Sequence, residues 1–233
     1  MARVDCGRND HDWNHKRMKR LLHIQASPRG IRSRSEAIGL HILQALQART
    51  PDLEIVTLNL FDAELPAFDG AAIDGRYELL MGEPVASAQQ AAWLELRTIA
   101  DHFLSFDTWL FTVPMWNFGL PYRLKHYVDL VTHPGLTFRN DADGNVEGLA
   151  AGRTAIIVAA SAMPFGANPE IEGLDFQLSY LRAWLGFIGV TDIQAVRVAG
   201  TFGPEAIVQA AMAKARADAD VLVDQCALRA ARV

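Results

Sequence analysis

Short apolar runs alternate with longer amphipathic segments along most of the chain. Runs of this length predict strands, here at residues 21–24, 54–60, 108–113, 154–160 and 193–198. Apolar residues at helical spacing between them predict helices at residues 36–48, 87–106, 121–132, 174–188 and 204–230. Strands that alternate with helices form βαβ units, so the pattern indicates an α/β domain with a parallel sheet. Residues 108–113 are apolar on both faces, which is typical of a central strand.

One segment departs from this alternation. Residues 136–138 and 146–149 flank Asp141-Ala142-Asp143-Gly144-Asn145, a run of residues that tolerate a positive φ. That pattern predicts a hairpin added to the sheet. Ahead of the first helix, Ser33 and Glu36 have the spacing of a capping box, in which each side chain bonds the backbone amide of the other residue.

Composition and charge narrow the classes of function. Apolar residues make up 50% of the 233 residues and charged residues 21%, a balance that supports a globular core. The net charge of -5 argues against a nucleic-acid partner, which requires a basic face. The longest apolar run is too short to cross a bilayer, so no membrane association is expected. Only two cysteines, Cys6 and Cys226, are present, which is too few for a disulfide framework or a cysteine-based zinc site. A reducing compartment is therefore expected, and with it a cytoplasmic location.

The first 17 residues are charged throughout and lack the apolar stretch of a secretory signal. They are expected to form a disordered leader ahead of one domain at residues 18–233. Met18 directly precedes the first strand, so Met1 and Met18 both stand as candidate start positions.

The loop after the first strand, residues 26–35, combines three serines, three arginines and the start of a helix. The N-terminus of a helix offers free amides and a positive partial charge, which suit a phosphate dianion. Serine hydroxyls add donors with little bulk. A capped helix with a solvated basic loop explains the same residues, so both interpretations stay open at this point.

The loop after the third strand, residues 114–121, brings Met115, Trp116 and Phe118 to a position where connections are usually polar. Two prolines stiffen this loop, and a glycine permits close backbone approach. A rigid apolar loop with one side-chain amide, that of Asn117, suits a flat heteroaromatic ring, because the amide can read the edge of the ring while apolar groups cover a face. A loop folded back into the core is the alternative interpretation.

Both loops follow strands, so both are expected at the carboxyl edge of the sheet. In the strand order 2-1-3-4-5, the first and third strands flank the switch point where a ligand binds. The chain is therefore expected to form a flavodoxin-like, doubly wound, five-stranded parallel sheet with helices on both faces and a small added hairpin. A phosphate loop beside a ring loop predicts a mononucleotide with a planar head. No G-x-G-x-x-G follows a strand, which argues against a tightly held dinucleotide.

Several longer motifs point to one family. The Ser-Pro-Arg loop with Ser33 and Ser35, the stretch PMWNFGLPYRLKHYVDLV, the segment GLTF and the segment YLRAWLGFIGVTDI resemble the FMN-dependent NADH:quinone and azo reductases, the azoreductase family. The resemblance extends over nearly all of the chain beyond the leader. It implies FMN as cofactor, NADH or NADPH as electron donor and a quinone or azo compound as acceptor, with donor and acceptor entering in turn.

The resemblance also assigns residues. It implies that Ser27 and the segment Ser33-Arg34-Ser35 hold the FMN phosphate. It implies that the isoalloxazine ring is lined by Met115, Trp116, Asn117 and Phe118. Members of the family often have Tyr where this chain has Trp116, so the acceptor preference is expected to differ. The Ser-Arg-Gly-Gly turn of many relatives is missing from Ala160-Ser161-Ala162-Met163-Pro164, so no flavin contact is assigned to that segment. No side chain is expected to act as an obligate acid or base.

Residues 174–188 carry an apolar arc that is wider than one core contact needs, and a homodimer interface explains the excess. Two other functions use the same fold. One is a flavodoxin-type electron carrier, and the other is a flavin-binding regulatory subunit without turnover. The added hairpin and the modest acidity count against the carrier, and steady NADH consumption with a quinone would discriminate against the subunit.

Overall fold

The computed structural model describes residues 18–70, 72–74, 78 and 87–230, so the predicted leader at residues 1–17 lies outside the described residues. Five parallel strands form one sheet in the order β2-β1-β3-β6-β7. In chain order they are β1 (Arg20–Gln25), β2 (Glu54–Asn59), β3 (Thr108–Pro114), β6 (Thr154–Ser161) and β7 (Asp192–Ala199). This is the order 2-1-3-4-5 with the hairpin strands left out of the count, and the predicted fold class is confirmed.

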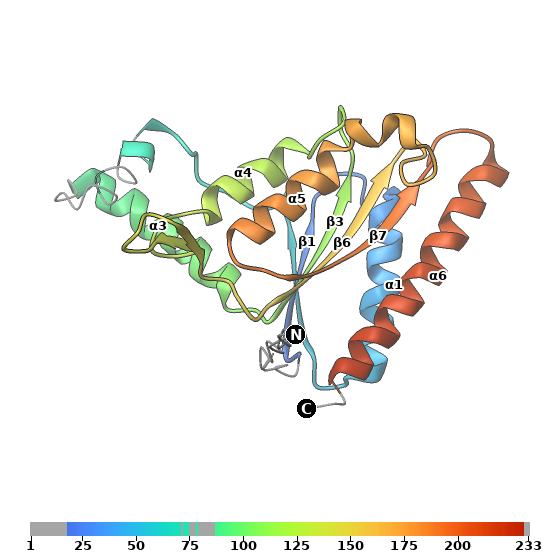
Figure 1. Ribbon diagram of the computed structural model, residues 1–233, viewed down its shortest axis with the longest axis horizontal. Coiled ribbons are helices and arrows are strands. Elements are labelled where there is room, and N and C mark those ends of the chain that lie inside the picture. The colour runs from blue at the N-terminus through green and yellow to red at the C-terminus, as the bar shows by residue number, and fades with distance from the viewer. Residues whose placement is uncertain (1–17, 71, 75–77, 79–86, 231–233) are drawn as a thin grey trace, which may run out of the picture.

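Helices cover both faces of the sheet (Figure 1). One face carries α1 (Arg34–Arg49) and α6 (Glu205–Ala230), and the other carries α3 (Ser87–Leu104), α4 (Tyr122–Val131) and α5 (Phe176–Phe187). Two short 3₁₀ helices, η1 (Gly30–Arg32) and η2 (Pro169–Leu174), precede α1 and α5. Within the part of the chain that the structure describes, no helix is long and apolar enough to cross a bilayer.

The start of α5 differs from its prediction at residue 174. Residues 169–174 form η2, and α5 begins after Asp175, whose carboxylate accepts hydrogen bonds from the amides of Gln177 at 3.1 Å and Leu178 at 2.9 Å. An N-cap of this kind fixes the first turn of a helix. Leu174 therefore lies in η2 and outside the apolar stripe of α5, which begins at Phe176.

The core has one apolar layer on each side of β3, which is buried from Thr108 to Val113 as predicted for a central strand. Under α3, α4 and α5, the indole of Trp109 stacks on Phe103 with ring centroids 4.1 Å apart. Under α1 and α6, Leu21 and Leu110 pack against Ile42. Each fully buried side chain of this size contributes about 1.5–3 kcal/mol of transfer free energy, so these layers fix the strands that support the loops.

The predicted hairpin is present as β4 (Phe138–Asn140) and β5 (Val146–Gly148), paired antiparallel. Its turn is held by Asp141, whose carboxylate accepts from the amides of Asp143 at 2.9 Å and Asn145 at 2.8 Å. At its base, a Cβ added to Gly148 would lie 2.1 Å from the backbone nitrogen of Gly189, so the two backbones are in direct contact. The hairpin is therefore docked on the turn that joins α5 to β7.

Strand register sets the positions of the two candidate loops. Gln25 at the end of β1 is opposite Thr112 of β3, and the amide of Ala26 donates to the carbonyl of Thr112 at 3.0 Å. Because β1 and β3 are paired and parallel, the loops that follow them leave the same edge of the sheet side by side.

Candidate functional site

The phosphate loop, residues 26–35, is built around the start of α1. Ser33 is the N-cap residue, and its hydroxyl accepts from the amide of Glu36 at 3.4 Å. The hydroxyls of Ser33 and Ser35 lie 3.1 Å apart, and the hydroxyl of Ser27 accepts from the amide of Arg29 at 3.4 Å. All three serines are buried, whereas Arg34 is half-buried. The structure thus brings together the four residues predicted for phosphate binding.

The donors at this helix start fit a phosphate. The amides of Arg34 and Ser35 form no hydrogen bond with any residue that the structure describes. They belong to the first turn of a 16-residue helix, where the helix dipole adds a positive partial charge. Two free amides, three nearby hydroxyls and three arginines make a donor set for a dianion.

The capping box is only half formed, so that prediction was partly wrong. Ser33 accepts the amide of Glu36, but the amide of Ser33 donates to the carbonyl of Gly30 at 2.9 Å and not to the carboxylate of Glu36. The carboxylate of Glu36 instead turns toward the sheet. It accepts from the side-chain amide of Gln25 at 2.6 Å and from the hydroxyl of Thr112 at 2.9 Å.

His23 completes this buried polar network. Its imidazole is fully buried in β1, with Nε2 at 3.2 Å from the Thr112 hydroxyl and at 3.5 Å from the Glu36 carboxylate. Burial acts to raise the pKa of the Glu36 carboxyl, but its interaction with His23 and the hydrogen bonds from Thr112 and Gln25 outweigh burial and hold that pKa below its ordinary value. Glu36 is therefore a carboxylate at neutral pH, in the first turn of the helix that begins in the phosphate loop.

The ring loop, residues 114–121, contains a tight two-residue turn. The backbones of Trp116 and Gly119 exchange hydrogen bonds of 3.1 and 3.0 Å, and the two residues between them, Asn117 and Phe118, have φ of 48° and 68°. Both central residues of a type I′ turn have positive φ, a conformation that costs residues with a side chain roughly 1–2 kcal/mol each. Backbone strain of this kind is concentrated at functional sites.

The tip of the ring loop faces solvent. Asn117 is exposed and Phe118 is 42% exposed, so the interpretation in which the loop folds back into the core is wrong for these two residues. Their amides form no hydrogen bond with the described residues. Met115 and Trp116 are half-buried, and the amide of Met115 donates to the carbonyl of Ala160 at 2.7 Å, which ties the loop to β6.

Two aromatic residues that the sequence analysis missed support Trp116. Its ring lies 5.8 Å from the ring of Phe61 and 6.4 Å from that of Tyr122, and Phe61 and Tyr122 are themselves 5.8 Å apart. Arg123 fixes the loop that carries Phe61, because its guanidinium donates to the carbonyls of Leu60 at 2.6 Å and Ala63 at 2.5 Å. The only sequence signal for this cluster was the position of Tyr122 directly after the ring loop.

The loop after β6 reaches the same edge of the sheet. Ser161 ends β6 with its hydroxyl donating to the carbonyl of Met163 at 2.7 Å, and its own carbonyl accepts from Thr201 at 3.0 Å. These bonds hold the Ser161 hydroxyl within its own loop. No flavin contact is assigned to this segment.

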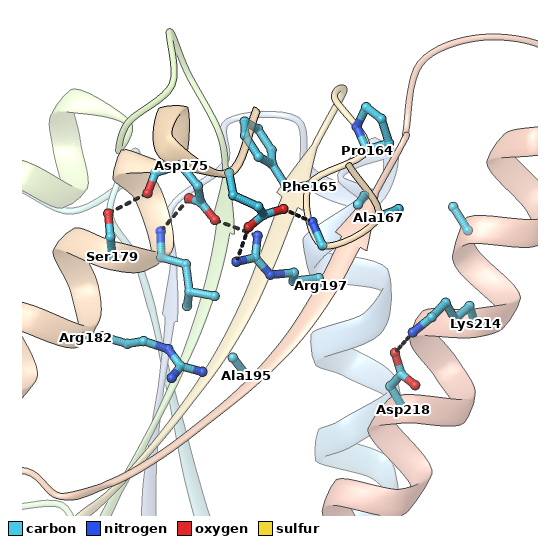
Figure 2. Close-up of a pocket in the computed structure, with 15 residues that line it drawn as sticks. Pro164, Phe165, Ala167, Asp175, Ser179, Arg182, Ala195, Arg197, Lys214 and Asp218 are labelled. Atoms are coloured by element: carbon cyan, nitrogen blue, oxygen red, sulfur yellow. Dashed lines mark hydrogen bonds and ion pairs between the residues drawn. The ribbon is translucent and has the colours of Figure 1, made fainter. Parts of the chain in front are cut away.

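A separate hollow of about 730 Å³ opens at the outer edge of β7, between α5, α6 and residues 164–175 (Figure 2). In Figure 2, Arg197 of β7 points toward Asp175, 2.5 Å away, while Lys214 and Asp218 pair with each other on α6. The edge strand β7 is separated from β3 by β6, so this hollow is away from the two candidate loops. Among the described residues, no group of three His, Cys, Asp or Glu side chains is arranged to hold a metal ion.

Comparison with known proteins gives one consistent result. The model of the flavodoxin-like fold family matches residues 19–222. An FMN-dependent NADH:quinone oxidoreductase 3 of Pseudomonas fluorescens is 38% identical over 215 residues, which span 91% of this chain and 99% of that protein. An FMN-dependent NADH:quinone oxidoreductase of Nitratidesulfovibrio vulgaris is 40% identical over 190 residues, 81% of this chain and 90% of that protein.

A solved structure agrees with these relatives. The crystal structure of an FMN-dependent NADH-azoreductase of Bacillus anthracis in complex with FMN has a TM-score of 0.76 and 25% sequence identity. The match covers 88% of this chain and all of that one.

Proposed function

The chain belongs to the flavodoxin-like fold family and, within it, to the FMN-dependent NADH:quinone oxidoreductases. On that premise we propose that it is an FMN-dependent oxidoreductase that passes electron pairs from NADH or NADPH to quinones and aromatic azo compounds. The observation that carries the proposal is the pairing of two loops at the β1/β3 switch point, one rich in anion donors and the other a strained turn with an exposed amide and apolar groups.

In this proposal the phosphate loop holds the FMN phosphate. The free amides of Arg34 and Ser35 donate to it, together with the hydroxyls of Ser27, Ser33 and Ser35. The charge of the Arg34 side chain adds attraction without a fixed geometry. Donors on a preformed helix start need little rearrangement, which favours tight binding of a dianion.

The ring loop positions the isoalloxazine. Met115 and Phe118 would give it an apolar contact, and the side-chain amide of Asn117 and the backbone amides of Asn117 and Phe118 would supply hydrogen-bond donors to its polar edge. When bound, FMN supplies the two-electron chemistry that links a nicotinamide to an acceptor. Backbone donors that are already in place stabilise negative charge without reorganisation. The strained turn would therefore contribute to function by keeping the amides of Asn117 and Phe118 available for negative charge on the reduced ring.

Trp116 forms a wall of the space in which donor and acceptor bind in turn. Its ring is held by Phe61 and Tyr122, so it offers a fixed aromatic face at the side of the ring loop. An aromatic wall favours flat molecules and limits the size of the acceptor that enters. This arrangement accounts for quinone and azo compounds as substrates.

We further propose a cytoplasmic homodimer whose interface borders the site. Part of the predicted apolar arc of α5 belongs to the core, since Leu181, Trp184 and Leu185 are buried. The support comes from Phe176 of that arc, which is exposed, and from other exposed apolar side chains at the carboxyl edge of the sheet, which are Ile31, Phe118, Tyr122 and Phe202. Exposed apolar residues gathered at one edge mark an interaction surface. A monomeric mass with full activity in light scattering at micromolar concentration would reject the dimer.

The test of the proposed function begins with the purified protein and its cofactor. After denaturation, chromatography of the released material should identify FMN, and the protein should consume NADH steadily with a quinone. FAD, or failure to bind any flavin after reconstitution, would contradict the proposal. FMN binding without NADH consumption would favour the electron carrier or the regulatory subunit.

A further inference from the structure

Glu36 is a buried carboxylate in the first turn of α1, and its only ion-pair candidate among the described residues is the imidazole of His23, with Nε2 3.5 Å away. It is the third residue of α1, one helical turn or less from the amides of Arg34 and Ser35, and its side chain is only 8% exposed. The partners of its oxygens at hydrogen-bonding distance are neutral donors, the amide of Gln25 at 2.6 Å and the hydroxyl of Thr112 at 2.9 Å. Carboxylates are rarely buried unless a cation pairs with them, so this arrangement calls for an explanation.

His23 is the one titratable side chain in this buried network besides Glu36. Its ring is fully buried, and its Nδ1 has no hydrogen-bond partner among the described residues. A doubly protonated ring would bury an Nδ1–H group without an acceptor, which is costly. The neutral tautomer with a proton on Nε2 completes a chain in which His23 donates to Thr112 at 3.2 Å and Thr112 donates to Glu36. In this arrangement the groups whose side chains donate hydrogen bonds to the carboxylate of Glu36 are neutral.

The arginines of the phosphate loop do not neutralise it either. Arg29 and Arg32 are exposed, Arg34 is half-buried, and none of the three forms an ion pair with a described residue. The charged pairs further along α1, His41 with Asp220 and Arg49 with Asp224, are formed with α6. Glu36 thus brings an anion to the first turn of α1, the same turn that carries the free amides of Arg34 and Ser35.

We propose that Glu36 sets the affinity for FMN by repelling its phosphate, so that the site binds the cofactor less tightly than its donors allow. The inference rests on the proposed function. A phosphate dianion at the free amides of Arg34 and Ser35 would lie in the same helical turn as this buried anion, where salt screens little. The same carboxylate anchors the start of α1 to β1 and β3 through Gln25 and Thr112. Glu36 therefore supports the loop in either state while its charge weakens only the filled site, which makes FMN exchangeable.

The substitution Glu36→Gln removes the charge and keeps the shape. Titration of the FMN-free variant, followed by flavin fluorescence, should show FMN bound at least about tenfold more tightly than by the unsubstituted protein. A tenfold change in Kd corresponds to about 1.4 kcal/mol, which is within the range of repulsion between two nearby charges. Riboflavin lacks the phosphate, so its affinity should change by less than about twofold. Glu54→Gln, with the same charge change at the exposed amino end of β2, is the matched control and should change neither affinity by more than about twofold.

Circular dichroism checks that each variant is folded, and Glu36→Met provides a second neutral side chain of similar length if Glu36→Gln does not fold. Unchanged or weaker FMN binding in a folded neutral variant would overturn the inference, because a purely structural role predicts that sign. Equal tightening of FMN and riboflavin would overturn it as well. Absence of FMN binding by the unsubstituted chain would instead overturn the proposed function, so the two failures are distinguishable.

Discussion

Replacing Ser33 and Ser35 by alanine one at a time separates helix capping from phosphate binding. The Ser33 hydroxyl caps α1 by accepting from the amide of Glu36, whereas the described partner of the Ser35 hydroxyl is Ser33 itself, 3.1 Å away. Loss of an N-cap costs about 1 kcal/mol, and the loss of one bond between hydroxyls costs roughly 0.5 kcal/mol. Ser33→Ala removes both bonds and Ser35→Ala only one. In a chain of this size, Ser33→Ala should therefore lower Tm of the FMN-free protein by about 3–6 °C, roughly three times the shift of Ser35→Ala.

The effect on FMN should follow a different order. A hydrogen bond to a charged group contributes about 1.5–3 kcal/mol, so each substitution should weaken FMN binding roughly 10- to 100-fold if both hydroxyls donate to the phosphate. Riboflavin binding should not change, because it has no phosphate to accept these bonds. The two variants are then unequal in stability and similar in FMN affinity.

Thermal unfolding of the FMN-free proteins and fluorescence titration with both flavins measure the two effects separately. Ser105→Ala is the matched control, because its hydroxyl bonds the carbonyl of His102 at 2.7 Å just before β3, at the opposite edge of the sheet. If both variants lose stability as expected but bind FMN with unchanged affinity, the serines only shape the start of α1. The assignment of the phosphate to this loop would then be wrong.

Three further predictions test other parts of the structure. Trp116→Ala should change the ranking of quinones and azo dyes by size more than it changes reduction of FMN by NADH, and equal slowing of both half-reactions in stopped-flow measurements would contradict this. Tyr127→Phe should raise the free energy of unfolding by about 1 kcal/mol, because the buried Tyr127 hydroxyl, whose pKa is raised by burial, has no partner among the described residues; a lower Tm would refute it. The lowered pKa of Glu36 contributes stability that is present above the ordinary glutamate pKa of about 4.3 and is lost as the pH falls through the folded-state value. Denaturant unfolding at a series of pH values should show a larger acid loss in the unsubstituted protein than in Glu36→Gln, since Glu54 and Asp141 also have lowered pKa values in both, and identical pH profiles would count against it.

The strand order and the placement of the two loops could be predicted because they follow from patterns that extend over the whole chain. Alternating strands and helices impose a parallel sheet, and in that sheet the segments after the first and third strands share an edge. The hairpin was also predictable, since Asp141 and Gly144 occupy turn positions that suit them. Long-range periodicity and turn chemistry were enough for these features.

The details that failed depend on contacts between distant residues. Glu36 has the local spacing of a capping box, but its carboxylate bonds Gln25 and Thr112, and only the assembled sheet brings these donors to it. The cluster of Phe61 with Trp116 joins loops from β2 and β3, which are not neighbours in the sheet. No pattern within one segment contains that information.

Backbone conformation in the ring loop was a third limit. From the sequence, Gly119 was expected only to permit close backbone approach, and the positive φ values of Asn117 and Phe118 were not predicted. Propensity assigns such values to glycine, so a bulky residue in this conformation is visible only in the structure. In the first turn of α5, the cap at Asp175 likewise overrode the apolar pattern that predicted an earlier start.

The contact between Gly148 and Gly189 divides the hairpin into two parts with opposite tolerance to engineering. At its base, any side chain would collide with backbone that has no flexible end to move aside. At its tip, Asp143 and Gly144 are exposed, and their bonds stay within the turn. Surface turns of this kind accept inserted peptides. The hairpin tip is therefore a position where a reporter or affinity tag can be carried on the folded protein. At its base, no residue other than glycine fits at positions 148 and 189.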